Sequence, residues 1–161
     1  MPGMNEVAKR AQALIRAGEL DQATALVTSA RTAAPDDVEL ALCQAQLLAL
    51  RGEHEAAIAL FEHSAISVPV ATRAPILQLL AVSYDELGRG DDVIATCRAA
   101  LAIDPERASA AWLLGLWLGK RRQFGEALGV LRRARPTARP RMQAAIDVLI
   151  AKIDAHLAGA A

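Results

Sequence analysis

Apolar positions along the chain recur at intervals of three and four residues, in short runs that end at a Gly or a Pro. The first run places Val7, Ala11 and Leu14 on one helical face. Gly18 then allows the positive φ angle that ends a helix at little steric cost, and Pro35 ends the next run because Pro disfavours helix in the residue before it. The pattern predicts two amphipathic helices joined by a tight turn.

The same Gly and Pro positions recur along the chain at regular intervals. Two markers step by 34 and then 36 residues: Gly18, Gly52 and Gly88, and then Pro35, Pro69 and Pro105. A third marker keeps the same register after each turn and continues for a further 34 residues, at Ala23, Ala57, Val93 and Ala127. Three markers in one register predict four helix–turn–helix repeats, with bounds at about 4–37, 38–71, 74–107 and 108–141.

This period and helix–turn–helix pattern resemble the tetratricopeptide repeat (TPR) family. Small residues stand where the paired helices of that family approach closely, and the "AIDP" of residues 102–105 is similar to the "LDP" that closes many such repeats. The fourth repeat departs from the pattern, because Arg122 stands where Gly is expected and Arg139 where Pro is usual. The resemblance implies an all-α, right-handed superhelical solenoid whose first helices line a concave groove. The small residues of the first helices are Ala11, Ala45, Ala81 and Gly115.

One further helix is predicted after the fourth repeat, at about 141–158. Its apolar residues form a single stripe, made of Met142, Ile146, Leu149, Ile150, Ile153 and Leu157. The terminal repeats of a solenoid need caps that cover their apolar faces. We therefore expect a C-terminal capping helix, which completes a single TPR domain over residues 1–161.

The sequence carries no motif for catalysis, for a cofactor or for a metal ion. The three His residues do not converge on one helical face, and Cys43 and Cys97 are too far apart for a CxxC pair. Lys and Arg balance Asp and Glu at 18 each, and no apolar run approaches the ~18 residues of a membrane span. We expect a cytoplasmic, non-enzymatic protein with no cofactor, no metal and no membrane partner.

One segment breaks this charge balance. From Lys120 to Arg141 the chain has eight basic residues and the single acid Glu126. The segment could meet an acidic protein segment or nucleic acid, or it could be a solvated, Arg-rich helical face. Nucleic-acid binding usually needs a more basic domain with aromatic groups interleaved, so the solvated face is the favoured interpretation.

Function is expected in the groove of the solenoid, where the partner is a protein or a peptide. The groove positions are largely apolar, and an exposed apolar patch often marks an interaction site. We hypothesise a protein-binding scaffold with Trp112 as the principal anchor, while Trp117 points elsewhere. By analogy with the family, the groove residues are Lys9, Gln12, Arg16, Leu42, Cys43, Gln46, Gln78, Leu79, Val82, Trp112, Leu113, Leu116 and Lys120.

Alternatives to this hypothesis stay open. The chain could be a chaperone for effector or translocator proteins, similar to the small TPR chaperones of bacterial secretion systems. It could also be a module that serves a larger enzyme. In addition, the terminal helix or a second copy of the chain, in a homodimer, could cover part of the groove.

Overall fold

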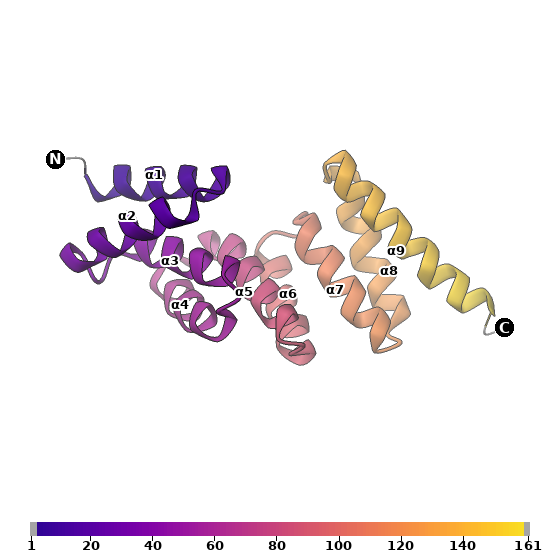
Figure 1. The fold of residues 1–161 in the computed structure, drawn as a ribbon. Helices are drawn as coiled ribbons and strands as arrows, with labels where there is room; N and C mark the ends of the chain where they lie inside the picture. The colour runs from indigo at the N-terminus through magenta and orange to yellow at the C-terminus, as the bar shows by residue number, and fades with distance from the viewer. Residues whose placement is uncertain (1–2, 160–161) are drawn as a thin grey trace. The chain divides into compact units, whose positions relative to one another are not determined.

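The computed structural model describes residues 3–159, apart from the side chain of Met4, and these residues form helices and short connections only. The chain divides into two compact units, one ending at Pro69 and one beginning at Val70. The first unit contains α1 (Met4–Ala17), α2 (Leu20–Ala33), α3 (Val38–Leu50) and α4 (His54–Ser67) (Figure 1). The second contains η1 (Val70–Thr72), α5 (Ala74–Glu86), α6 (Gly90–Ile103), α7 (Ala108–Lys120), α8 (Phe124–Ala134), η2 (Arg135–Thr137) and α9 (Pro140–Gly159).

The helix bounds reproduce the period of the sequence. The first helices of the four pairs begin at Met4, Val38, Ala74 and Ala108, which are spaced by 34, 36 and 34 residues. The two helices of each pair pack against each other. The longer step falls at η1, between the second pair and the third. The prediction of an all-α helical repeat is confirmed. None of the described helices combines the length and the apolar character that a membrane span requires.

All four turns within the pairs close with the same two backbone hydrogen bonds. After α1, the N–H of Gly18 donates to the carbonyl of Ile15 at 3.1 Å, and the N–H of Glu19 donates to that of Leu14 at 2.9 Å. The equivalent bonds after α3, α5 and α7 are 2.9 or 3.0 Å long. These bonds satisfy carbonyls that a helix end leaves free, and they require a left-handed residue just after the helix. The Gly residues with positive φ are Gly18, Gly52 and Gly88.

The fourth turn places a residue with a side chain in this left-handed conformation. Arg122 has a φ of 59°, and no other described residue except Gly has a positive φ. A residue with a side chain in this region costs about 1–2 kcal/mol of stability. Replacing it with Gly removes that cost, but Gly also raises the entropy of the unfolded chain, which offsets part of the gain. We expect Arg122→Gly to raise the free energy of unfolding by about 1 kcal/mol in a urea titration.

The matched control for this variant is Gly52→Ala, which introduces the same strain into the second turn. A Cβ at Gly52 would meet no atom within 4 Å, so crowding cannot account for the result. We expect this variant to lose about 1 kcal/mol. An Arg122→Gly protein no more stable than its parent would contradict the strain argument.

Small residues allow the paired helices to approach closely, as the repeat pattern predicts. The small residues of the first helices and those that follow each turn are all buried. At Gly115 of α7, even an added methyl group would lie 2.8 Å from Cγ of Leu131 on α8. Larger residues at these positions would force the helices apart, because protein interiors are already close-packed.

One core cluster of the first unit lies between α1, α2 and α3. Leu40 and Leu47 of α3 and Val27 of α2 are buried there. Asp37 begins α3, since its carboxylate accepts a hydrogen bond from the N–H of Leu40 at 2.9 Å. Such a cap satisfies one of the free donors at the helix start, and its loss typically costs about 1 kcal/mol.

Trp117 of α7 connects three helices of the second unit. Its indole N–H donates a 2.7 Å hydrogen bond to Asp85 Oδ1 on α5. Its ring lies against Gly90, the first residue of α6, where an added methyl group would lie only 2.3 Å from the ring atom Cζ3. The ammonium of Lys120 lies 3.9 Å from the ring centroid. Trp117 therefore packs within the unit.

The last helix, α9, packs against α7 and α8 and caps the second unit. Ile146 and Ile153, two turns apart, are buried in this contact. Arg135 donates a 2.8 Å hydrogen bond to Asp147. This hydrogen bond holds the pKa of Asp147 below its ordinary value, so the contact favours the folded state above the ordinary carboxyl pKa and is lost on acidification. A second exposed ion pair joins Arg132 of α8 to Asp154 of α9 at 3.6 Å. The expected capping helix is present.

Candidate partner-binding groove

One face of α7 carries a line of exposed and half-buried side chains. Trp112, Leu116 and Lys120 follow one another at intervals of four residues, which aligns them along the helix. The neighbouring residues Leu114 and Leu118 are buried on the other side of α7. The side of α7 with Leu114 and Leu118 packs into the unit. The opposite side carries Trp112 and Leu116, which remain partly accessible.

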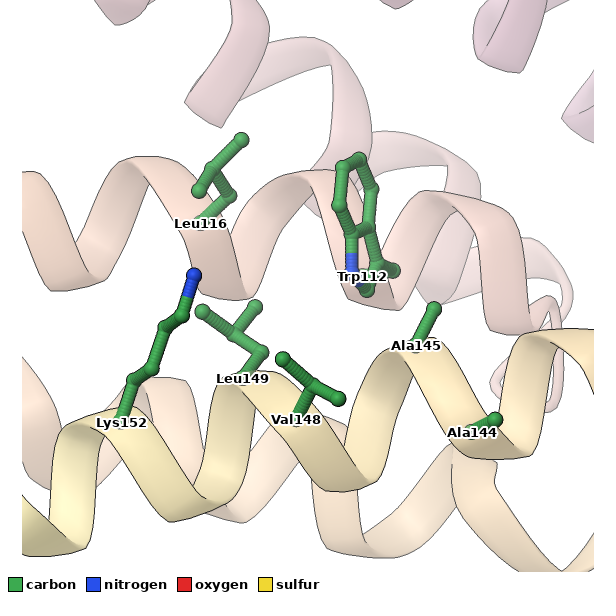
Figure 2. Close-up of a pocket in the computed structure, with 7 residues that line it drawn as sticks. All are labelled: Trp112, Leu116, Ala144, Ala145, Val148, Leu149 and Lys152. Carbon is green, nitrogen blue, oxygen red and sulfur yellow. The ribbon is translucent and has the colours of Figure 1, made fainter.

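The opposite wall is supplied by α9, and the two helices flank an open groove of about 370 Å³. We call it the cap groove. In Figure 2, Leu149 of α9 points toward α7, and Lys152 extends across the opening toward the segment that carries Leu116. Val148 remains more than half exposed at the edge, at 56%. The residues that line the cap groove are Trp112, Leu116, Ala144, Ala145, Val148, Leu149 and Lys152.

Two of the groove residues expected in the second unit line this cavity, and the rest lie elsewhere. Lys120 lies next to it, in an adjoining cavity that also includes Leu116. Leu79 and Val82 of α5 do not line the cap groove. Gln78 accepts a 3.0 Å hydrogen bond from Arg107 at a separate polar cavity. Leu113 is buried in the unit, so we leave it out of the proposed binding surface.

The groove residues expected in the first unit lie on α1 and α3, which pack against each other. Lys9 is exposed and forms an ion pair with Glu6 at 3.6 Å, which is worth little in solvent. Arg16 is exposed, and the remaining polar and apolar side chains are half-buried. The half-buried residues are Gln12, Leu42 and Gln46.

Cys43, the last of the expected groove residues, is buried beneath α1. Its thiol lies 3.7 Å from the carbonyl oxygen of Ala8. Burial raises the pKa of Cys43 to about 11 and that of Cys97 to about 12, and nearby carboxylates add to both shifts. Both thiols therefore stay protonated near neutral pH, where only a thiolate would be a reactive nucleophile. We interpret Cys43 and Cys97 as small apolar core residues.

Acidic residues elsewhere in the second unit neutralise part of the basic segment 120–141. Arg121 pairs with Asp91 of α6 at 2.7 Å, and Arg132 and Arg135 pair with the acids of α9. Pairing of this kind is what a solvated, Arg-rich face shows, and it removes positive charge that a nucleic acid would need.

No group of three or more His, Cys, Asp or Glu side chains within residues 3–159 is arranged to hold a metal ion. His156 instead lies against Phe124, with 5.1 Å between the ring centroids. This contact joins α9 to the start of α8.

Comparison with solved structures identifies the architecture. TTC0263, a thermophilic TPR protein of Thermus thermophilus, superposes with a TM-score of 0.76 at 17% identity, over 94% of this chain and 83% of that one. The fold is that of TPR proteins. MamA from Desulfovibrio magneticus RS-1 matches with a TM-score of 0.70 at 17% identity, over 81% of this chain and 72% of that one. MamA from AMB-1 matches with a TM-score of 0.67 at 22% identity, over 83% of this chain and 72% of that one. No protein-family model and no curated protein sequence matches the chain.

In this TPR fold, the cap groove includes residues that the sequence interpretation did not place in a binding surface. They belong to α9, which the pattern identified as a cap and, in an alternative interpretation, as a helix that covers part of the groove. Val148 and Lys152 lie off the apolar stripe that packs α9 onto its neighbours. An apolar residue outside such a stripe was the available signal for a second use of the helix.

Proposed function

We propose that this protein is a non-enzymatic protein-interaction scaffold, and that its cap groove binds an apolar segment of a partner protein. The observation that carries the proposal is the 370 Å³ cavity between α7 and α9, with Trp112 and Leu116 on one wall and Leu149 on the other. Concave cavities with mostly apolar linings are the usual form of ligand sites. The TPR fold supports this function, because helical solenoids bind partners on extended surfaces.

Trp112 is proposed as the principal anchor of this site. It is half-buried, so part of its side chain remains accessible to a partner. Trp is enriched among the residues that dominate binding energies, because it offers a large contact area with few rotatable bonds. The indole N–H and the ring of Trp117, by contrast, both make contacts within the unit.

Peptide selection tests this proposal. Random peptides displayed on phage are selected on the full-length protein, and the dissociation constants of the selected peptides are measured by fluorescence anisotropy. We expect Trp112→Ala to weaken binding by at least ~2 kcal/mol, which is about thirtyfold in the dissociation constant. The melting temperature of this variant should change little, because the side chain is only half-buried.

Two control variants make this result interpretable. Leu87→Ala removes an exposed apolar side chain outside the cap groove and should leave peptide binding unchanged. Leu114→Ala truncates a core residue of α7 and should cost about 2–5 kcal/mol of stability. If Trp112→Ala unfolds the protein as severely as Leu114→Ala does, Trp112 belongs to the core and the proposal is overturned.

A further inference from the structure

The cap groove continues into a second cavity of different character. This cavity has a volume of about 400 Å³ and shares Leu116, Leu149 and Lys152 with the cap groove. We call it the basic cavity, because it adds a Lys and an Arg side chain and includes no carboxylate. The residues that it adds are Gly119, Lys120, Arg122, Phe124, Ile153 and His156.

The acids of α9 are directed away from this site. Asp147 and Asp154 lie on the face toward α8, where Arg135 and Arg132 neutralise them. Lys152, which points toward α7, pairs with no carboxylate of the described residues. The helix therefore separates its charges, with the acids on one face and a cation at the groove.

Arg122 and Lys120 add positive charge from the end of α7. The left-handed turn carries Arg122 to the edge of the basic cavity, where it has no carboxylate partner among the described residues. Lys120 lies over the ring of Trp117, a contact that keeps the full charge of the ammonium. Charges beside a binding cavity favour partners of the opposite sign and speed their association.

We propose that the partner of the cap groove is a peptide segment in which a bulky apolar residue has Asp or Glu within a few residues of it. The apolar side chain enters between Trp112 and Leu149, and the carboxylates lie along Lys152, Arg122 and Lys120. This inference rests on the proposed function, since it specifies the partner of the same groove. It adds an electrostatic requirement that an apolar cavity alone would not impose.

The test compares matched peptides on the full-length protein. Selected peptides that carry Asp or Glu are resynthesised with Asn or Gln at those positions, and both forms are titrated at low and at high salt. We expect the acidic form to bind about fivefold more tightly, which is the size of an exposed ion pair, and to lose this advantage at high salt. Lys152→Gln should remove most of the advantage, whereas Arg133→Gln, an exposed change on α8, should retain it.

The possible outcomes separate this inference from the function on which it rests. Peptides that depend on Trp112 but bind equally in the acidic and amide forms would overturn the inference and leave the proposed function standing. A failure to select any peptide that depends on Trp112 would overturn both. Self-association that competes with the peptides would assign the groove to a second copy of the chain, and it would overturn the inference as well.

Discussion

Removal of residues 141–161 is expected to abolish cooperative unfolding of the second unit. The deletion takes away α9, whose buried residues Ile146 and Ile153 cover α7 and α8. Each large aliphatic side chain removed from water contributes roughly 1.5–3 kcal/mol, and the apolar surface left on α7 would be exposed as well. The sum is comparable to the ~5–15 kcal/mol by which a whole domain is stable.

Thermal unfolding followed by circular dichroism, together with binding of a dye that reports exposed apolar surface, measures this effect. The truncated protein should melt over a broad range and bind the dye before it melts. Removal of residues 158–161 alone is the control, because Ala158 and Gly159 are exposed. A protein truncated at Pro140 that melts as its parent does would show that α9 is not a cap.

Replacement of Trp117 by Ala is expected to destabilise the second unit by about 3 kcal/mol, at the low end for a Trp in a core because the side chain is partly accessible. The substitution removes the packing against Gly90 and the hydrogen bond to Asp85 together. It leaves a cavity where α5, α6 and α7 meet. Urea unfolding monitored by circular dichroism gives the change in free energy.

Two further variants divide this effect between packing and hydrogen bonding. Asp85→Asn keeps an oxygen that accepts from the indole and should cost less than Asp85→Ala, which leaves the indole without its partner. Trp112→Ala provides the comparison for a Trp on the groove face. If Trp117→Ala is no more destabilising than Trp112→Ala, the structural role assigned to Trp117 is wrong.

The repeat architecture could be predicted from the sequence because its determinants are local. Gly18, Gly52 and Gly88 mark left-handed positions, and such positions depend on the backbone of a few residues. Arg122 could be identified as the equivalent residue of the fourth repeat from its register, and its φ confirms the equivalence. The small residues at the helix contacts follow from the same period.

The binding surface could not be predicted with the same accuracy, because it depends on which faces the neighbouring helices cover. Adjacent residues of a helix point about 100° apart, so Leu113 is buried while Trp112 beside it lines the groove. Cys43 is buried because α1 covers the face of α3 on which it lies. The sequence leaves open whether the last helix covers the groove, because nothing in it gives the direction in which that helix crosses α7.

The closed turns also determine where the chain can begin to fold. Each helical hairpin joins two helices through a few residues, so bringing its helices together costs little loop entropy. Chains dominated by such local contacts fold quickly, and a repeat array can nucleate at any of its hairpins. Three hairpins have Gly at the left-handed position, whereas α7 and α8 must close around Arg122. The α7–α8 hairpin, which supplies one wall of the proposed binding site, is therefore expected to nucleate least readily and to form on a neighbour that has already folded.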